Sequence, residues 1–485
     1  MICFRAVIVL LACFYVVDSR CVTLDEVLNV YCMNTAKVRS LRMEYANSRL
    51  AYENYRKGFL PTLSFGVSPV SFNRSLRLLQ NPLTGDYSYV NDYSNASSAE
   101  ITITQRIGIT GGTLIASSSL NFLREFSYNR NNFNTSPVYI SYTQPLRGGR
   151  YLYEHTRNVE RMRYDLARRA FVAGVAAERQ SVAALYMAMY VSKHRYETAV
   201  SKAAIADSLL ELAKVKLLHG AITRYECNQI ELQNANSHIN VRRNLLDYDN
   251  AKADILLELD IDDIEVERFD VSALPRSLDI AEVKKFVNAN NPHTVQQALR
   301  LEQARIERYN SRMSTRFGGN VTLMYGLNQY ATTLARAYTS PERRQAIGVT
   351  FSIPVFEWGV NGNKRRMADN AFSQAQIEVA QNSRRFWENL SKQVMEYNYL
   401  MASFENVERQ HKLAMEQYVL AVDRFRNGNM STFELTAIYE QVLTTEQNVC
   451  GVEQTLCNTY HTICAMSHYD FMTRRSFEQI CVALL

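Results

Sequence analysis

Two stretches of this chain each continue for roughly 65 residues with almost no residue that would interrupt a helix. Residues 151–219 contain no proline and one glycine, and residues 363–427 contain neither. A helix of that length would extend about 100 Å at 1.5 Å per residue. Such a length is typical of a coiled coil or a helical barrel. With nine prolines and eighteen glycines among 485 residues, we expect long continuous elements rather than several compact domains.

Each long stretch ends in the same pattern, a glycine followed at three-residue intervals by Ser or Thr and then by Glu. The residues are Gly220, Thr223 and Glu226 in the first stretch, and Gly428, Ser431 and Glu434 in the second. Glycine just past a helix end adopts the left-handed conformation without steric cost. The Ser/Thr-x-x-Glu spacing is that of the reciprocal capping box. The pattern therefore predicts a tight turn into a returning helix at each position, and a purely structural cap is enough to explain it.

The paired patterns indicate that the chain contains two copies of one unit. Pro145 and Pro354 each end a strand-like stretch, are followed by glycines, and precede one of the long helical stretches. The separation of the two prolines is 209 residues, and that of the two hairpin glycines is 208. A weaker match of Asn34 with Asn291 has a larger offset. Because this offset is larger than the other two, we expect the first copy to contain an insertion of about 50 residues among its strands.

Alternation with period two predicts strands before each long helical stretch. Ile101 and Ile103 alternate with Thr102 and Thr104, which gives one apolar and one polar face. The expected strands cover about 59–72, 99–109, 113–124 and 137–146 in the first copy and lie within 317–356 in the second; polar loops are expected at 81–98, 126–136 and 329–345. The apolar face meets lipid in a membrane barrel and the core in a soluble sandwich, and strand composition alone does not separate the two.

The N-terminus has the features of a targeting segment. Arg5 precedes an apolar run from Ala6 to Val17, and Ser19 precedes an expected cleavage point. An alternative is a lipoprotein signal in which Cys13 is acylated. After Ser19 there is no run of 18 apolar residues, so we expect no transmembrane helix.

The cysteines after Ser19 do not indicate a disulfide framework, because their number is odd. Cys450, Cys457 and Cys464 recur every seven residues, and this spacing predicts small apolar residues on one packed helix face.

Charge and motifs argue against nucleic-acid binding and against catalysis. The net charge of +6 is small for this length, and its cations are scattered. No phosphate-binding loop, Gly-x-Ser-x-Gly or His-Glu-x-x-His motif occurs. Asp260, Asp262 and Asp263 lack the spacing of a calcium loop, and we interpret them as part of a solvated linker. We expect no enzyme activity, no cofactor and no metal site.

The doubled strand-Pro-Gly entrance at Pro145 and Pro354, with the doubled hairpin pattern, resembles the TolC-like outer-membrane efflux protein family over essentially the whole chain after residue 19. The resemblance implies an α+β membrane protein. It implies a homotrimer in which three chains share one β-barrel in outer-membrane lipid and one long periplasmic helical barrel. The implied function is the passive exit duct of a tripartite efflux pump in a Gram-negative bacterium. The implied partners are a periplasmic adaptor protein and an inner-membrane transporter.

The resemblance also assigns roles to the hairpin residues. Gly220, Thr223, Gly428 and Ser431 would form the periplasmic tips that contact the adaptor; Glu226, Glu434 and Arg224 would be candidates for closing the entrance. Arg224 would pair with Glu434 or with a neighbouring chain. Two alternatives stay open: an outlet for protein secretion, and a periplasmic coiled-coil scaffold without channel activity.

The expected organisation follows from these patterns. It comprises a signal peptide at 1–19, a first repeat at 20–259 with strands at about 59–146 and a helical hairpin at 151–259, a linker at 260–278, a second repeat at 279–470 with strands at about 317–356 and a hairpin at 361–467, and a C-terminal tail at 471–485.

Overall fold

The computed structural model describes residues 21–80, 85–126, 128–267 and 269–481, so the expected signal peptide and Cys13 lie outside the described residues. The chain divides into two compact units. Unit 1 holds the residues up to Ala46, Ala167–Thr294 and the residues from Ser383 onward, and unit 2 holds Asn47–Leu166 and Val295–Asn382. The four boundaries between them fall inside helices.

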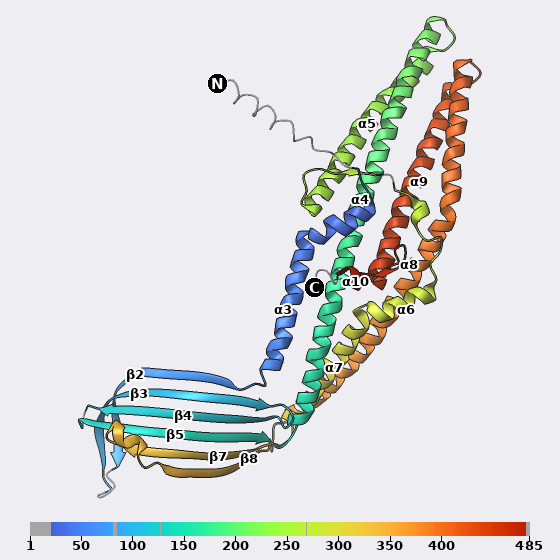
Figure 1. Ribbon diagram of the computed structural model, residues 1–485. Coiled ribbons are helices and arrows are strands. Elements are labelled where there is room, and N and C mark those ends of the chain that lie inside the picture. The colour runs from blue at the N-terminus through green and yellow to red at the C-terminus, as the bar shows by residue number, and fades with distance from the viewer. Residues whose placement is uncertain (1–20, 81–84, 127, 268, 482–485) are drawn as a thin grey trace, which may run out of the picture. The chain divides into compact units, whose positions relative to one another are not determined.

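Four long helices dominate the chain, and they form two hairpins (Figure 1). The first hairpin consists of α4 (Gly149–Leu218) and α5 (Arg224–Leu259), and the second consists of α8 (Val360–Arg426) and α9 (Thr432–Ser467). Helices α4 and α8 have 70 and 67 residues, and α5 and α9 have 36 each. None of the helices among the described residues combines the length and apolar character needed to cross a membrane.

Unit 2 contains one antiparallel sheet of six strands, which lie side by side in Figure 1 in the order β2-β3-β4-β5-β7-β8. The strands are β2 (Thr62–Gln80), β3 (Tyr87–Ile107), β4 (Gly112–Glu125), β5 (Arg130–Pro145), β7 (Gly318–Ala331) and β8 (Glu342–Ser352). Consecutive strands are neighbours throughout. The first four come from one expected repeat and the last two from the other.

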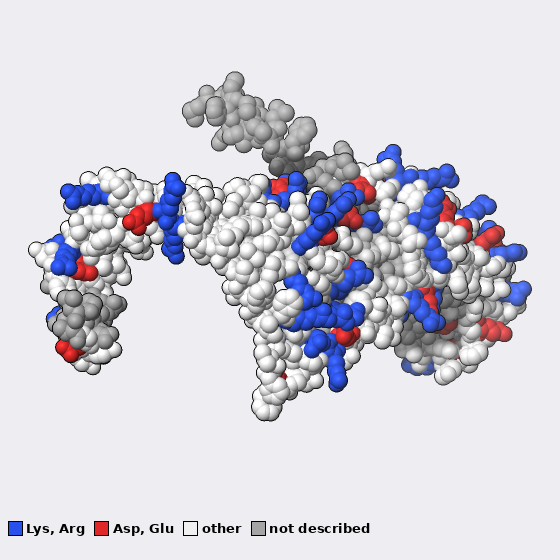
Figure 2. Space-filling model, turned by 90° about the horizontal axis from the view of Figure 1, so that it is seen from below, with Lys and Arg blue, Asp and Glu red and all other residues white. Residues whose placement is uncertain are grey.

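The register separates an apolar face of this sheet from a polar one. Leu63 lies opposite Ile103 on the neighbouring strand, and Leu323 lies opposite Ile347. On the other face many pairs are small and polar, as in Ser64 opposite Thr102 and Thr322 opposite Gly348, whereas Ser141 lies opposite Met324. The apolar side chains are exposed, with 71% of Leu63 and 79% of Ile347 open to solvent. Figure 2 shows that Lys, Arg, Asp and Glu side chains are sparse over the sheet on the face in view.

The strands extend well into the segments expected as polar loops, and this part of the sequence prediction is wrong. Strand β3 already begins at Tyr87, and β5 at Arg130. Aromatic cross-strand contacts continue the ladder there: the rings of Phe72 and Tyr93 pack edge to face with centroids 5.2 Å apart. Tyr and Phe favour strands even among polar neighbours, so a polar composition alone did not mark the loops.

The linker expected at 260–278 is packed rather than solvated. Ile264, Val266, Val271, Leu274 and Leu278 are all buried. Strand β6 (Glu265–Val266) pairs in parallel with β1 (Cys21–Val22). The acidic run at its start suggested a solvated segment, but apolar residues at short intervals after that run enter the core of unit 1.

The other elements are short, apart from two helices of 22 residues and one of 11. They are α2 (Leu24–Glu26), η1 (Val27–Tyr31), η2 (Cys32–Asn34), α3 (Ala36–Lys57), η3 (Val271–Ala273), α6 (Ile280–Asn290), α7 (His293–Ser314), η4 (Leu334–Tyr338), β9 (Tyr469–Asp470), β10 (Arg475–Ser476) and α10 (Phe477–Cys481). In the segment expected as a C-terminal tail, Phe477 and Cys481 are buried in the core of unit 1.

The three cysteines at seven-residue spacing lie in that interior, as the spacing predicts. Cys450, Cys457 and Cys464 are each at most 2% exposed and are free thiols. Burial raises the pKa of the Cys450 thiol to about 11 and that of Cys457 to about 12. At neutral pH these thiols are therefore protonated and act as small apolar side chains.

Candidate functional site: the two hairpin tips

The first hairpin turns through a Schellman motif centred on Gly220. The backbone of Gly220 has φ +71°, in the left-handed region, and a side chain at this position would strain it. The Gly220 amide donates to the Leu217 carbonyl at 3.0 Å, and the Ala221 amide donates to the Lys216 carbonyl at 2.9 Å. These two bonds satisfy carbonyls at the end of α4 that have no partner within the helix.

The second hairpin repeats this geometry at Gly428. Its φ is +76°. The Gly428 amide donates to the Phe425 carbonyl at 3.1 Å, and the Asn429 amide donates to the Arg424 carbonyl at 2.9 Å. The two tips therefore share one backbone design, which the glycine spacing predicts.

Both returning helices begin with the complete capping box. The Thr223 amide donates to Oε2 of Glu226 at 2.7 Å, and the Glu226 amide donates to Oγ1 of Thr223 at 3.2 Å. At the second tip, the Ser431 amide donates to Oε2 of Glu434 at 3.0 Å, and the Glu434 amide donates to Oγ of Ser431 at 3.3 Å. Bonds from the cap backbone, then from the cap hydroxyl, lower the pKa of Glu226 and of Glu434 below the ordinary value.

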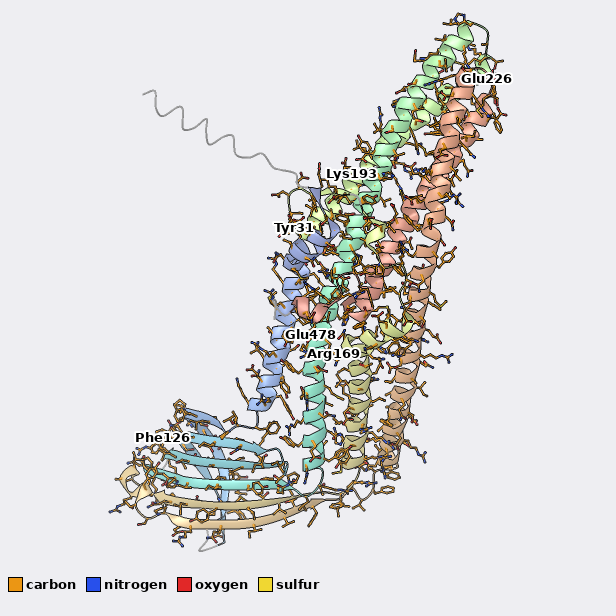
Figure 3. All side chains as sticks on the ribbon, turned by 45° about the vertical axis from the view of Figure 1, so that its right-hand side comes forward. Tyr31, Phe126, Arg169, Lys193, Glu226 and Glu478 are labelled. Carbon is orange, nitrogen blue, oxygen red and sulfur yellow. The ribbon has the colours of Figure 1, made fainter. Side chains whose placement is uncertain are left out.

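Glu226 lies at the turn between α4 and α5 (Figure 3). Among the described residues of this one chain, its carboxylate and that of Glu434 bond to their own caps, and Arg224 forms no ion pair with Glu434. Arg224 is exposed. We expected Arg224 to pair with Glu434 or with a neighbouring chain. Pairing with a neighbouring chain therefore stays as a proposal.

A lysine joins the two tips, and the sequence prediction missed it. The Lys216 ammonium donates to the Phe425 carbonyl and lies 4.5 Å from the centroid of the Phe425 ring. It thus connects the end of α4 with the end of α8. A signal was present: Arg424 stands 208 positions after Lys216, so each outgoing helix has a cation in its last turn, where it complements the helix dipole.

A pocket lies between the two turns, above an apolar core that the hairpins share. Its lining includes Lys216, Ile222, Glu226, Met430 and Glu434. The core beneath packs α4, α5, α8 and α9 together through Leu209, Cys227, Ile230, Tyr418, Phe425, Leu435 and Tyr439. The two turns are therefore anchored to each other from below, while their polar groups stay accessible.

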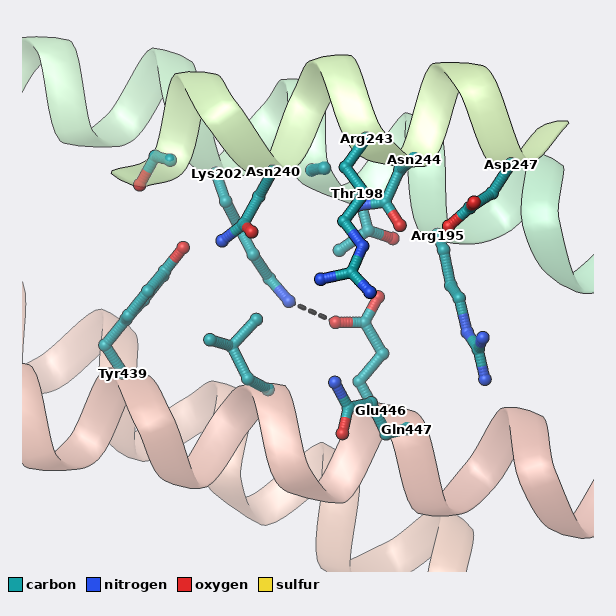
Figure 4. A pocket seen from close by; sticks show the side chains of 13 residues that line it. Arg195, Thr198, Lys202, Asn240, Arg243, Asn244, Asp247, Tyr439, Glu446 and Gln447 are labelled. Atoms are coloured by element: carbon teal, nitrogen blue, oxygen red, sulfur yellow. Dashed lines mark hydrogen bonds and ion pairs between the residues drawn. The ribbon is translucent and has the colours of Figure 1, made fainter. Parts of the chain in front are cut away.

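A second polar pocket lies farther along the hairpins, between α4, α5 and α9 (Figure 4). At its floor the Lys202 ammonium of α4 pairs with the Glu446 carboxylate of α9, and each side chain is only 9% exposed. Arg195 and Arg243 line the opening. No local pattern predicts this pair, because its members are 244 residues apart.

The expected strand-to-helix entrances are built differently in the two halves. Pro145 ends β5 opposite Asn320. After it, Gly149 approaches the preceding turn so closely that a Cβ there would come within 2.5 Å of the Thr110 carbonyl oxygen. Pro354 instead lies beyond the end of β8, in the irregular link before α8.

The described residues contain no cluster of His, Cys, Asp or Glu side chains arranged to hold a metal ion. The tips offer backbone amides, two capped carboxylates and two cations. These groups can bind and orient a partner surface.

Comparisons with known proteins identify the kind of fold. Residues 287–466 match the family model described as Outer membrane efflux protein. No curated protein matches the chain. Among solved structures, a membrane protein from Pseudomonas aeruginosa is 12% identical, with 94% of this chain and 92% of that chain covered and a TM-score of 0.68.

Two further structures are similar to the chain over most of its length. The outer membrane protein VceC from Vibrio cholerae is 12% identical, with 92% of this chain and 96% of that chain covered and a TM-score of 0.63. The open-state MtrE outer membrane channel of Neisseria gonorrhoeae is 12% identical, with coverage of 92% and 88% and a TM-score of 0.59.

The fold is thus that of outer-membrane channel proteins. The expected resemblance to the TolC-like outer-membrane efflux family is confirmed, by sequence over residues 287–466 and by fold over nearly the whole chain.

Proposed function

We propose that this protein is the outer-membrane exit duct of a tripartite efflux pump. Three chains would share one barrel in outer-membrane lipid, and their helical hairpins would cross the periplasm of a Gram-negative bacterium. Cargo would pass through without an energy-coupling step in this protein. An inner-membrane transporter and a periplasmic adaptor would supply the energy and the contact with the tips.

The observation that carries this proposal is the exposed apolar face of the sheet. Leu63, Phe65, Ile347, Val349 and Phe351 are each more than half exposed. In water, a contiguous apolar surface of this kind would favour aggregation. Against lipid the same surface is stable, and the small polar residues of the opposite face would line an aqueous lumen.

Aromatic side chains near both ends of the strands support a membrane setting. Phe356 and Trp358 follow the end of β8 and are 70% and 87% exposed. Tyr87, Tyr89 and Tyr330, near the other ends of their strands, are each at least 66% exposed. Tyr and Trp concentrate at both boundaries of a bilayer, where their amphipathic rings contact lipid and water.

Fractionation of the host envelope tests this proposal. The protein should sediment with outer membranes, resist extraction by salt, and have the mass of three chains in mild detergent. A salt-extractable protein with the mass of one chain would instead support a periplasmic scaffold and contradict the duct.

We further propose that Glu226 and Glu434 help to close the tip. The Glu434→Ala variant should then raise single-channel conductance, because removal of the carboxylate loosens the capped turn. Glu416→Ala, which removes an exposed carboxylate on α8 away from the turn, is the matched control. Equal conductance of the two variants would remove Glu434 from the closing mechanism.

A further inference from the structure

The two outer strands of the sheet, β2 and β8, are suited to pair with another chain. They are the first and last strands in the sheet order, so each has one side without a strand neighbour among the described residues. Exposed edges usually contain charged residues or proline that discourage pairing. Residues 62–68 of β2 and 345–352 of β8 contain neither. Because the sheet has an even number of antiparallel strands, β2 and β8 also point in opposite directions.

The strands are already staggered as a closed barrel requires. Thr62, the first residue of β2, can be followed straight across the sheet through partners in each neighbouring strand: Thr104, Ile115, Ser141, Met324 and Ala346. Ala346 lies six residues before Ser352, the last residue of β8. Each strand is therefore shifted along the strand direction by about one residue relative to its neighbour.

This stagger corresponds to a definite strand tilt. One residue of rise, about 3.4 Å, for each strand spacing of about 4.8 Å gives a tilt of about 35°. Closed barrels have tilts of about 35–45°. If the same ends of all strands lie at one membrane boundary, the sheet has the tilt of a barrel wall before any second chain is added.

The stagger also fixes how two copies would meet. We place the start of β2 in one copy level with the end of β8 in the next copy. Thr62 of the first copy then lies opposite Ser352 of the second. Leu63 is then opposite Phe351, and Gly66 is opposite Gly348. Apolar residues meet apolar residues on the lipid face, and small residues meet on the other. A shift by one residue would reverse this match.

From these observations we propose that three copies close an eighteen-stranded barrel through β8–β2 junctions in which Gly66 faces Gly348. The inference rests on the proposed function for the number of copies, and it adds the strand count, the register and the width. The stagger does not determine how many copies close the barrel. The mass of the particle in detergent therefore tests whether there are three.

A barrel of this size has a wide lumen. Eighteen strands at that tilt give a backbone diameter of about 35 Å. Many inward positions are occupied by small residues, including Ser64, Gly66, Thr102, Thr104, Ser141, Thr322, Gly348 and Thr350, and the same registers place Tyr139, Met324 and Arg344 on this face. Where the side chains are short, about 25 Å stays open, and the longer side chains narrow the lumen locally. The barrel would then admit bulky cargo, and size selection would occur at the hairpin tips.

Disulfide cross-linking tests the junction in the full-length protein. A side chain at Gly66 or at Gly348 would meet no atom within 4 Å, so the Gly66→Cys/Gly348→Cys variant should fold. Each chain then carries both halves of the junction. A copper–phenanthroline oxidant should convert most of the protein into covalent trimers on a non-reducing gel.

The control keeps one cysteine and moves the other by a single position. In Gly66→Cys/Val349→Cys the second thiol faces the opposite side of the sheet, and this variant and both single variants should stay as monomers on the gel. A native trimer in which the first pair does not cross-link, or cross-links no better than the control, would overturn the eighteen-stranded barrel and leave the duct intact. A particle that is not a trimer would overturn both.

Polymer exclusion tests the width separately. Polyethylene glycols with a hydrodynamic radius of about 10 Å should reduce conductance when added on the barrel side, because a lumen of about 25 Å admits them. The same polymers should have a much smaller effect from the tip side. Exclusion from both sides would contradict the wide barrel.

Discussion

At each hairpin tip, one glycine and one carboxylate determine the path of the backbone. Gly428 supplies the left-handed residue, and Glu434 accepts the amide of Ser431. These contacts join residues at most six positions apart, so the sequence predicted them completely. Lys216 was missed because its partner Phe425 lies 209 positions away, and only the packing of one hairpin on the other brings the two together.

The left-handed glycine gives the first prediction. Gly428→Ala should destabilise unit 1 by about 1 kcal/mol, because a Cβ in the left-handed region clashes with its own backbone. Gly451→Ala is the matched control: it lies inside α9, has open space around it, and should stabilise by about 0.5–1 kcal/mol. Thermal unfolding in detergent measures both, and equal shifts would contradict the role of φ at the turn.

The capping carboxylates predict a pH dependence. Their pKa values are lowered in the folded state. The stabilisation they give is therefore present above the unfolded pKa of about 4.3 and is lost as the pH falls through the folded value. Hydrogen exchange at the Thr223 and Ser431 amides, corrected for intrinsic rates, should show protection that falls below that pH. The Glu226→Gln/Glu434→Gln variant should not show this fall, and a fall of equal size in it would contradict the cause.

Among the elements, the helices were predicted more accurately than the strands and the linker. Long stretches with almost no proline or glycine predict the ends of α4 and α8 to within three residues. Strand β3 was predicted too short, because its first half is polar and pairs with the distant β2, where cross-strand contacts such as that of Tyr93 with Phe72 extend the ladder. The segment 260–278 was expected to be solvated, because its burial depends on contacts with the distant first residues of unit 1. Local patterns identify an element, and non-local pairing sets its limits.

The buried ion pair between α4 and α9 gives a prediction at this scale. Glu446→Gln should destabilise the paired hairpins by about 3 kcal/mol, because it leaves the Lys202 ammonium buried without its counter-charge. The double variant Lys202→Met/Glu446→Leu should recover most of this loss, since apolar side chains of similar size fill the same space. Thermal unfolding of the two variants measures the difference. A double variant as unstable as the single one would contradict this account.

For the whole molecule, we propose that the exposed apolar sheet face and the two matched hairpins belong to one channel. The sequence predicted the class of protein from the order and spacing of a few motifs. The four strands of the first copy were predicted, but β2 and β3 were predicted too short because they continue through residues with no clear alternation, and the strands of the second copy were not counted. The proposed junction between copies is argued from the register of the sheet, which is a property of the folded chain.

The most direct test is planar-bilayer conductance of the protein purified from detergent-extracted outer membranes, with its mass measured in the same detergent. The account predicts a particle of three chains that gives small, stable conductance steps while the tips are closed. A single chain that produces no conductance would contradict the channel and support a periplasmic scaffold.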